Sequence, residues 1–523
     1  MPSSGVSSAK CEEVEIQRFS REMTGYMAWN LVGLILPLPI GLVALPFIAT
    51  HLGEYRFGLL SAVWAITGYF SLFDLGVGRA LTRELSAALR HSEARTVTEL
   101  VHTATTLSLT LGLVGAAVLC LASPLISQVL DVGGGSRIET LWTVVAASTL
   151  LPGLLLAAVA QGIMESLRLF RGLAWFRITL TTATYVVPVA ILPLSSNVAT
   201  IVVALAIARV LVLATGWVFL TRRDVPAFGF AGSTRKSARD LLAQGAWMTV
   251  SGVVSPILTF LDRWFVAVLV SVSALGYYTV PMELGQRLLV IAAGIAGVLF
   301  PLFAREGGNS TRTLTGYRQS LGAIIVLVVP ITFIVGCGAE ELLRVWVGDA
   351  FAREGATTLR IVAVGILTNS AARVPFTLLQ SAGKSRLTAA IHLAELPVYL
   401  IIVWQLTKSY GLAGAAAAWT IRVTIDLICM LIAAGRITSE LASACARVGG
   451  VVTLVIGCYM SSMALGPGPT RVLAAVGSMA VITLATWFAI LRREDRTLLL
   501  GWRRRQQADM GADTYSNKIV DRR

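Results

Sequence analysis

The sequence contains few charged residues. Asp, Glu, Lys and Arg make up 14% of its 523 residues, whereas a soluble domain carries about 25%. Hydrophobic residues make up 55%, and the mean hydropathy is +0.75. A chain of this composition cannot cover a water-facing surface, and no long polar stretch divides it into soluble domains. We therefore expect a single membrane bundle whose surface mostly contacts lipid.

Catalytic and metal-binding motifs are absent as well. The sequence has no GxSxG, P-loop or HExxH motif, and its six cysteines form no CxxC pair. Isolated histidines are more typical of interfacial residues than of ligands or bases, and all four here are isolated: His51, His91, His102 and His392. We therefore expect no enzymatic activity, no metal site and no cofactor.

Fourteen apolar stretches are long enough to cross a bilayer as helices, which takes about 17–25 residues. They cover residues 26–48, 57–78, 100–122, 139–162, 177–193, 198–220, 243–270, 276–303, 317–338, 357–381, 388–406, 411–434, 447–465 and 470–491. The polar segment 1–25 precedes a first stretch that is too long for a cleavable signal peptide. We predict an all-α polytopic membrane protein with about fourteen transmembrane helices.

The net charge of +14 is distributed unevenly over the predicted loops. If the N-terminus is cytoplasmic, 31 of the 43 Lys and Arg residues lie on the cytoplasmic side and 6 on the other side. Such an asymmetry sets topology, so we expect both termini to be cytoplasmic in a bacterial inner membrane, and no nucleic-acid partner. The basic cytoplasmic loops and the 492–523 tail are expected to contact anionic membrane lipids.

Three short matches indicate an internal repeat. They are Ala28-Trp29 with Ala246-Trp247, Leu52-Gly53 with Leu275-Gly276, and Arg209-Val210 with Arg422-Val423. An offset of six spans preserves orientation, so we expect two parallel six-helix repeats and two appended helices. The predicted segments are a cytoplasmic N-terminal segment, an N-lobe, a basic cytoplasmic linker, a C-lobe, the appended spans and a basic tail, at 1–25, 26–220, 221–242, 243–434, 435–491 and 492–523.

Charged residues inside the predicted spans are the candidates for function, because each is costly in a bilayer unless it is paired or faces water. They are Asp74, Arg209, Asp262, Arg263, Glu283, Arg287, Arg360, Arg373, Glu395, Arg422 and Asp426. Glu283 with Arg287, and Arg422 with Asp426, have the i,i+4 spacing of helical ion pairs. For the residues near span ends we favour ion pairs that hold helices together: Asp74, Asp262 and Arg263.

Four of the arginines lie nearer the middle of their spans and are candidates for substrate binding: Arg209, Arg287, Arg373 and Arg422. The planar guanidinium matches a phosphate or pyrophosphate group. The sequence supports two roles equally for these four arginines: they line a cavity, or they form ion pairs between helices. The acidic candidates Glu283, Glu395 and Asp426 are either partners of arginines or sites of coupling to a proton or sodium ion, and both interpretations stay open.

Short motifs follow one another along most of the chain. They are Gly68-Tyr69-Phe70-Ser71-Leu72-Phe73-Asp74-Leu75-Gly76-Val77-Gly78 with Leu81-Thr82-Arg83, then Leu275-Gly276-Tyr277-Tyr278, Leu379-Gln380-Ser381-Ala382-Gly383-Lys384, and Glu395-Leu396-Pro397-Val398-Tyr399-Leu400 leading to Gly414-Ala415-Ala416 and Arg422. Together with the number of spans, they resemble the polysaccharide-transporter branch of the multidrug/oligosaccharidyl-lipid/polysaccharide flippase superfamily, from about residue 25 to residue 490.

The resemblance implies two six-helix lobes around a cationic central cavity, with two extra helices. It further implies that this cavity binds the pyrophosphate and sugars of an undecaprenyl-linked oligosaccharide and opens alternately to each side of the membrane, for surface polysaccharide biosynthesis. Other polysaccharide-assembly proteins would then be candidate partners.

Three alternatives stay open. A cation-coupled drug exporter of the same superfamily usually has twelve spans and an acidic cavity. A membrane-embedded polysaccharide polymerase or ligase usually has a long periplasmic loop, whereas the longest outside loops here are 123–138 and 339–356. A scaffold that transports nothing is the third alternative.

Overall fold

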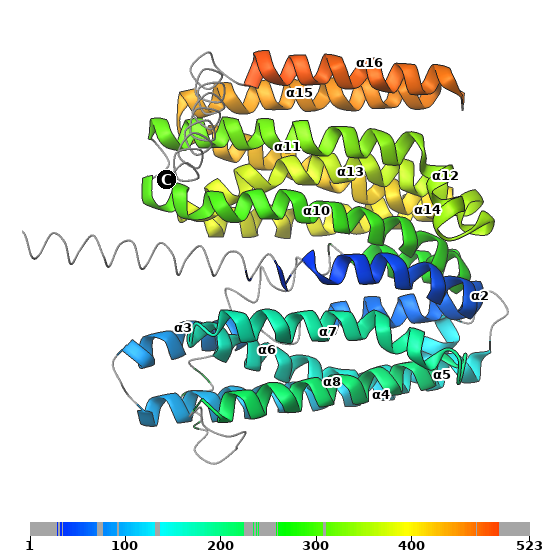
Figure 1. Cartoon of the computed structure of the whole chain (residues 1–523), viewed down its shortest axis with the longest axis vertical. Coiled ribbons are helices and arrows are strands. Elements are labelled where there is room, and N and C mark those ends of the chain that lie inside the picture. The colour runs from blue at the N-terminus through cyan, green and yellow to red at the C-terminus, as the bar shows by residue number, and fades with distance from the viewer. Residues whose placement is uncertain are drawn as a thin grey trace, which may run out of the picture. The chain divides into compact units, whose positions relative to one another are not determined.

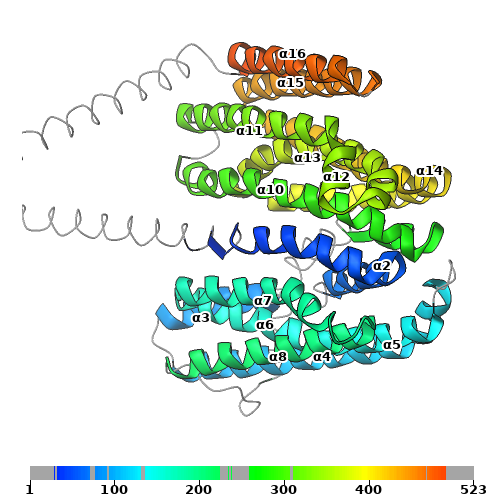
Figure 2. The same cartoon turned by 45° about the vertical axis from the view of Figure 1, so that its right-hand side comes forward.

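The structure, a computed structural model, describes residues 35–70, 77–90, 94–130, 136–223, 260–306, 310–466 and 468–490, with a few isolated positions besides. Regular elements in this part of the chain are all helical (Figures 1 and 2). They are α2 (Pro37–Phe70), α3 (Val77–Arg90), α4 (Ala94–Leu130), α5 (Arg137–Ser148), α6 (Leu150–Ser166), α7 (Phe170–Ile191), α8 (Val198–Thr221), α10 (Val272–Glu306), α11 (Thr311–Cys337), α12 (Ala339–Trp346), α13 (Asp349–Ser381), α14 (Ser385–Gly435), α15 (Ser439–Ala464), α16 (Pro469–Ala485) and a π-helical turn at Thr486–Ile490. The predicted all-α class is confirmed.

Ten helical segments in the described part of the chain are long and apolar enough to cross a membrane. They correspond to twelve of the fourteen predicted stretches, because α2 and α14 each contain two of them. The two helical segments of α2 meet at Gly53 (φ 73), and those of α14 meet at Gly411 (φ 58). Glycine adopts a positive φ without a steric penalty, so each glycine lets one segment turn directly into the next. The remaining two stretches are 276–303, inside α10, and 243–270, of which only the C-terminal part is described.

Two predicted loops contain helices of their own. The segment 79–99, between the predicted stretches 57–78 and 100–122, overlaps α3, and the predicted outside loop 339–356 contains α12. On α3 the apolar residues Val77, Leu81 and Leu85 recur at helical spacing and are buried, whereas the residues between them are largely polar. Such amphipathic helices are too polar to register as spans in a hydropathy reading.

Polar side chains cap four of the described helices, α5, α8, α11 and α15, where they begin. The Ser136 side chain accepts a hydrogen bond from the Glu139 backbone N–H at 3.3 Å at the start of α5. Asn197 caps α8 in the same way, through the backbone N–H of Thr200. Glu139 also forms an ion pair with Arg56 at 2.9 Å. The two cap contacts of Ser136 and Asn197 satisfy backbone donors that a helix leaves free at its N-terminus.

The described residues form two compact units. Unit 1 contains the described residues up to Arg287, together with Leu343–Gly355 and Leu396–Ala418. Unit 2 contains Leu288–Leu342, Ala356–Glu395 and the described residues from Trp419 onward. The long helices α10, α13 and α14 therefore contribute residues to both units. The predicted lobes, 26–220 and 243–434, and their arrangement as parallel repeats stay predictions.

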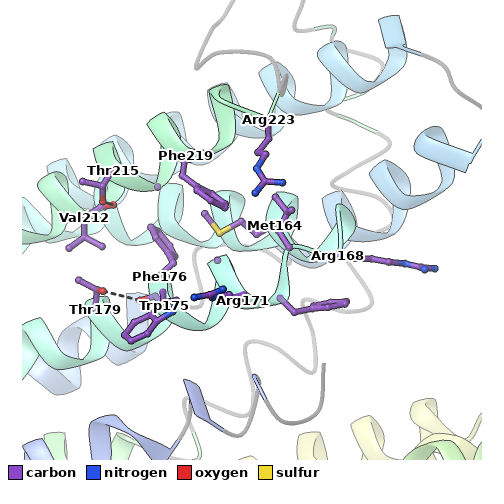
Figure 3. Close-up of a pocket in the computed structure, with 14 residues that line it drawn as sticks. Met164, Arg168, Arg171, Trp175, Phe176, Thr179, Val212, Thr215, Phe219 and Arg223 are labelled. Atoms are coloured by element: carbon purple, nitrogen blue, oxygen red, sulfur yellow. Dashed lines mark hydrogen bonds between the residues drawn. The ribbon is translucent and has the colours of Figure 1, made fainter. Parts of the chain in front are cut away.

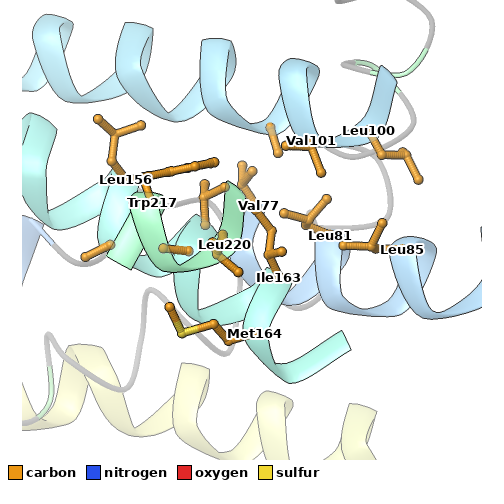
Figure 4. Close-up of a cluster of buried hydrophobic side chains, with 14 of the residues drawn as sticks. Val77, Leu81, Leu85, Leu100, Val101, Leu156, Ile163, Met164, Trp217 and Leu220 are labelled. Atoms are coloured by element: carbon orange, nitrogen blue, oxygen red, sulfur yellow. The ribbon is translucent and has the colours of Figure 1, made fainter. Parts of the chain in front are cut away.

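Part of the core of unit 1 lies where α3, α4, α6 and α8 meet (Figure 4). Leu81, Val101 and Leu220 are buried there. The close approach of α3 to α6 depends on two glycines, because a Cβ added to Gly162 would lie 2.7 Å from the carbonyl oxygen of Gly78. Helices in membranes associate largely through such close packing of small residues. This core holds together the ends of α6 and α8.

Candidate functional site

Two buried arginines share one carboxylate in unit 1. Arg263 Nη2 donates a hydrogen bond to Glu283 Oε1 at 3.1 Å, and Arg287 Nη2 lies 3.5 Å from Glu283 Oε2. The side chains of Arg263 and Arg287 are only 1% and 9% exposed. Ionised groups at this depth need a partner of opposite charge. The structure thus contains the ion pair that the i,i+4 spacing of Glu283 and Arg287 predicted, with Arg263 as a second cation.

The rest of the Arg287 guanidinium is also engaged. Its Nη1 donates to the Leu38 carbonyl at 3.1 Å, and its Nη2 donates to the Tyr185 hydroxyl at 2.9 Å. The guanidinium carbon lies 5.1 Å from the centroid of the Tyr185 ring, within the range of a cation–π interaction. Gly41 leaves room for it, since an added Cβ would lie 2.5 Å from the guanidinium nitrogens. Arg287 therefore links α10 to both α2 and α7.

Asp262 balances the charge of this first cluster, which we define as Asp262, Arg263, Glu283 and Arg287. Its carboxylate accepts hydrogen bonds from the Tyr278 hydroxyl and from the backbone N–H of Arg263. Asp262 and Arg263 are almost completely buried, at 0% and 1% exposure. The cluster holds two positive and two negative groups, an arrangement typical of ion pairs that fasten helices together. Asp74, for which the same role was expected, lies outside the described residues.

Charged residues from two helices form the second cluster, in unit 2. Arg373 lies on α13, whereas His392, Glu395, Arg422 and Asp426 lie on the two segments of α14. His392 Nε2 lies 3.3 Å from Asp426 Oδ1. Glu395 interacts electrostatically with Asp426 and Arg422, and Asp426 interacts in turn with Arg373. The structure thus brings together four of the seven candidate residues.

His392 corrects an expectation from the sequence. We expected an isolated interfacial residue, whereas the structure places its Nε2 3.3 Å from the Asp426 carboxylate and stacks its ring on Phe376, with centroids 5.9 Å apart. The two partners are 34 positions apart on different segments of α14, so no local spacing could reveal them. The i,i+4 pair of Arg422 with Asp426 stays a prediction.

Arg209 differs from the other candidate arginines. Its Nη2 donates to the Thr184 hydroxyl at 3.4 Å, and among the described residues no carboxylate pairs with it. By contrast Arg360, another charge predicted inside a span, lies 3.6 Å from Glu340. A cation within a membrane helix is costly unless it meets water, a counter-charge or an anionic ligand. Among the described residues, Arg209 is therefore the candidate arginine for which the structure shows no counter-charge.

We expect Asp426→Ala to destabilise the protein by about 1.5–3 kcal/mol, because it removes the carboxylate that interacts with Arg373 and leaves Glu395 as the remaining carboxylate of the cluster. The double variant Asp426→Ala/Arg422→Ala restores the balance of charge and should recover most of the melting temperature and membrane level. Thermal unfolding in detergent measures both variants. A double variant no more stable than Asp426→Ala alone would contradict the balance that we infer.

One family model matches this chain over residues 26–306, more than half of its length, and describes a polysaccharide biosynthesis protein. The chain belongs to this family. A protein of Shigella flexneri that carries the name "Putative O-antigen transporter" is 27% identical over 403 residues, which cover 76% of this chain and 94% of that protein.

Solved structures show that this member of the polysaccharide biosynthesis family has the fold of the multidrug/oligosaccharidyl-lipid/polysaccharide (MOP) superfamily transporters. An inward-facing multidrug resistance MATE family transporter matches with a TM-score of 0.64 at 14% identity, covering 80% of this chain and 95% of that one. The lipid II flippase MurJ, in an inward closed conformation, matches with a TM-score of 0.63 at 13% identity, covering 91% and 99%. These likenesses concern the fold alone. The resemblance inferred from short motifs is confirmed.

Proposed function

We propose that this protein moves a lipid-linked oligosaccharide, carried on undecaprenyl pyrophosphate, from the cytoplasmic to the periplasmic leaflet by alternating access. Membership of the polysaccharide biosynthesis family is the observation that carries the proposal. The relative named as an O-antigen transporter and the fold shared with a lipid II flippase support it. Translocation of this kind breaks no covalent bond, which agrees with the absence of a recognisable catalytic motif in the sequence.

Arg209 is our first candidate for holding the pyrophosphate. A guanidinium offers two parallel N–H donors to a phosphate, and such charge-assisted bonds are stronger away from bulk water. The Thr184 hydroxyl at 3.4 Å is a weak partner that an anionic ligand can replace. Arg287, Arg373 and Arg422 complete the candidate binding set, although carboxylates of the two clusters already neutralise part of their charge.

The second cluster is our candidate for ion coupling. Two carboxylates that interact closely repel each other when both are ionised, and a shared proton or sodium ion relieves that repulsion. Glu395 and Asp426 form such a pair, and His392 next to Asp426 is a further group that can accept a proton. The Glu283 carboxylate is held by two arginines, so we assign it to ion pairing instead.

A cation-coupled multidrug exporter is the second candidate function. The fold likeness to a MATE family transporter favours it, and the pair Glu395 and Asp426 could attract a cationic drug. The two candidates differ in the charge of the transported molecule, so one reconstituted preparation can separate them.

Reconstitution tests the proposal directly. Purified protein in liposomes is expected to move a fluorescent polyprenyl-pyrophosphate oligosaccharide between leaflets faster than empty liposomes do, as measured by quenching from one side of the membrane. The same probe with a neutral lipid anchor is the control for leakage. Export of a fluorescent cationic drug without movement of the glycolipid would replace the flippase with the exporter.

The topology is a separate prediction. We expect reporter fusions at position 230, which lies outside the described residues, to be active only with a cytoplasmic reporter. Fusions at Gly348, in the turn between α12 and α13, should be active only with a periplasmic one. The 31-to-6 distribution of Lys and Arg motivates both expectations. The reverse pattern of reporter activity would overturn the assigned orientation.

A further inference from the structure

A cavity of about 640 Å³ lies in unit 1 between the end of α6, the start of α7 and the end of α8 (Figure 3). Among the described residues that line it are the three arginines Arg168, Arg171 and Arg223 and four aromatic rings, and none of these described residues is acidic. None of these residues belongs to the charge clusters described above. The described lining therefore combines positive charge with an apolar wall, which suits an anion attached to an apolar body.

Glycines and phenylalanines of α7 and α8 build the wall of this cavity. A Cβ added to Gly172 would lie 2.8 Å from the Phe219 ring, and one added to Gly216 would lie 2.5 Å from the Phe176 ring. A phenylalanine ring of each helix thus packs against a glycine of the other helix. This packing fixes both rings and leaves the space beside them open.

The backbone presents Arg168 at a position that usually requires glycine. Arg168 has φ 55, and the hydrogen bonds Arg168 N–H to Glu165 O and Leu169 N–H to Met164 O close a Schellman turn at the end of α6. A left-handed conformation is strained for a residue that has a Cβ. Keeping an arginine where glycine would be free of strain is consistent with a use for its side chain.

The cavity extends along the helices from a charged end to an apolar end. Arg223 and Val212 are eleven residues apart on and just beyond α8, or about 16 Å. Figure 3 shows Val212 and Thr179 at the end opposite to Arg223 and Arg168. Trp175 in the lining is 50% exposed, and Trp residues are enriched at membrane–water interfaces. These features match a lipid whose headgroup meets Arg171 and Arg223 and whose acyl chain follows α7 and α8.

We propose that this cavity binds the phosphate headgroup of an anionic phospholipid from the cytoplasmic leaflet. All three arginines fall in loops that the charge distribution assigns to the cytoplasmic side, so the choice of leaflet rests on the topology given under the proposed function. Basic pockets between helices on that side of a membrane are where anionic headgroups bind. The Arg223 guanidinium lies over the Phe219 ring, 5.6 Å from its centroid, and is thereby held at the rim of the cavity.

Lipid-dependent stability tests the proposal without any transport assay. Phosphatidylglycerol added to the detergent-solubilised protein should raise its melting temperature saturably, whereas phosphatidylcholine with the same acyl chains should not. Arg171→Gln/Arg223→Gln should weaken the response by roughly 100-fold in lipid concentration, since each lost charged contact accounts for roughly tenfold. The matched control is Arg222→Gln, an exposed arginine next to Arg223 that does not line the cavity.

Two further measurements test the lipid site independently of the arginine variants. Thr215→Phe fills the cavity without changing its charge and should also abolish the response to phosphatidylglycerol. It therefore tests the proposal even if the double arginine variant fails to fold. Soluble glycerol 3-phosphate should not reproduce the effect, and if it does, the cavity is an anion site rather than a lipid site. An unchanged response in Thr215→Phe, or equal responses of the double arginine variant and Arg222→Gln, would overturn the proposal.

Discussion

Glu283→Ala is expected to destabilise the protein by about 3–5 kcal/mol, because it leaves two buried arginines without their shared carboxylate. Arg263 and Arg287 are 1% and 9% exposed, so water cannot replace the lost partner. The change should appear as a lower melting temperature in detergent and a lower level of protein in the membrane. Glu283→Gln keeps the shape of the side chain but removes its charge, and should show most of the same loss.

An exposed ion pair in the same unit provides the matched control. Arg344 and Asp349 lie 3.1 Å apart but are 47% and 69% exposed. Exposed pairs contribute about 0–1 kcal/mol, so Asp349→Ala should leave the melting temperature nearly unchanged. If Glu283→Ala behaved like Asp349→Ala, the first cluster would have no structural role and Glu283 would become a candidate for coupling again.

The helical architecture could be predicted because the bilayer imposes it. A membrane span must satisfy its backbone hydrogen bonds internally, so long apolar stretches become helices whatever their tertiary contacts are. Hydropathy could not show how the stretches are connected. The left-handed φ of Gly53 and Gly411 joins successive spans into α2 and α14, and the helical nature of α3 comes from burial of one face against α4 and α6.

Contacts between distant parts of the chain explain what the sequence could not reveal about the candidate site. The i,i+4 spacing of Glu283 and Arg287 is local, so their ion pair could be predicted from the sequence. The bond of Arg287 to Tyr185 spans 102 positions, and that to the Leu38 carbonyl spans 249. The pairing of His392 with Asp426 depends on the turn within α14. A list of intramembrane charges identifies candidate residues. Only the tertiary structure shows which of these charged side chains already have a partner of opposite charge and which do not.

Among the substitutions of candidate arginines, we expect Arg209→Ala to have the largest effect on transport. Arg209→Ala should reduce binding of a pyrophosphate lipid by at least roughly 100-fold, because two hydrogen bonds to a charged group contribute about 3–6 kcal/mol. Arg209→Lys should rescue only partly, since an ammonium cannot make the bidentate contact. The measurement is glycolipid translocation in liposomes, with substrate concentration varied to separate binding from rate.

Stability distinguishes this role from a structural one. Among the described residues, Arg209 has its 3.4 Å bond to Thr184 and no carboxylate partner, so the melting temperature of Arg209→Ala should stay close to that of the wild type. Glu283→Ala should show the opposite behaviour, with stability lost first. Thr184→Val is the matched control, because it removes the partner of Arg209 but keeps the guanidinium, and transport should persist. If Arg209→Ala unfolds the protein while Thr184→Val abolishes transport, Arg209 acts through the packing of α7 against α8, and the pyrophosphate must be held by other residues.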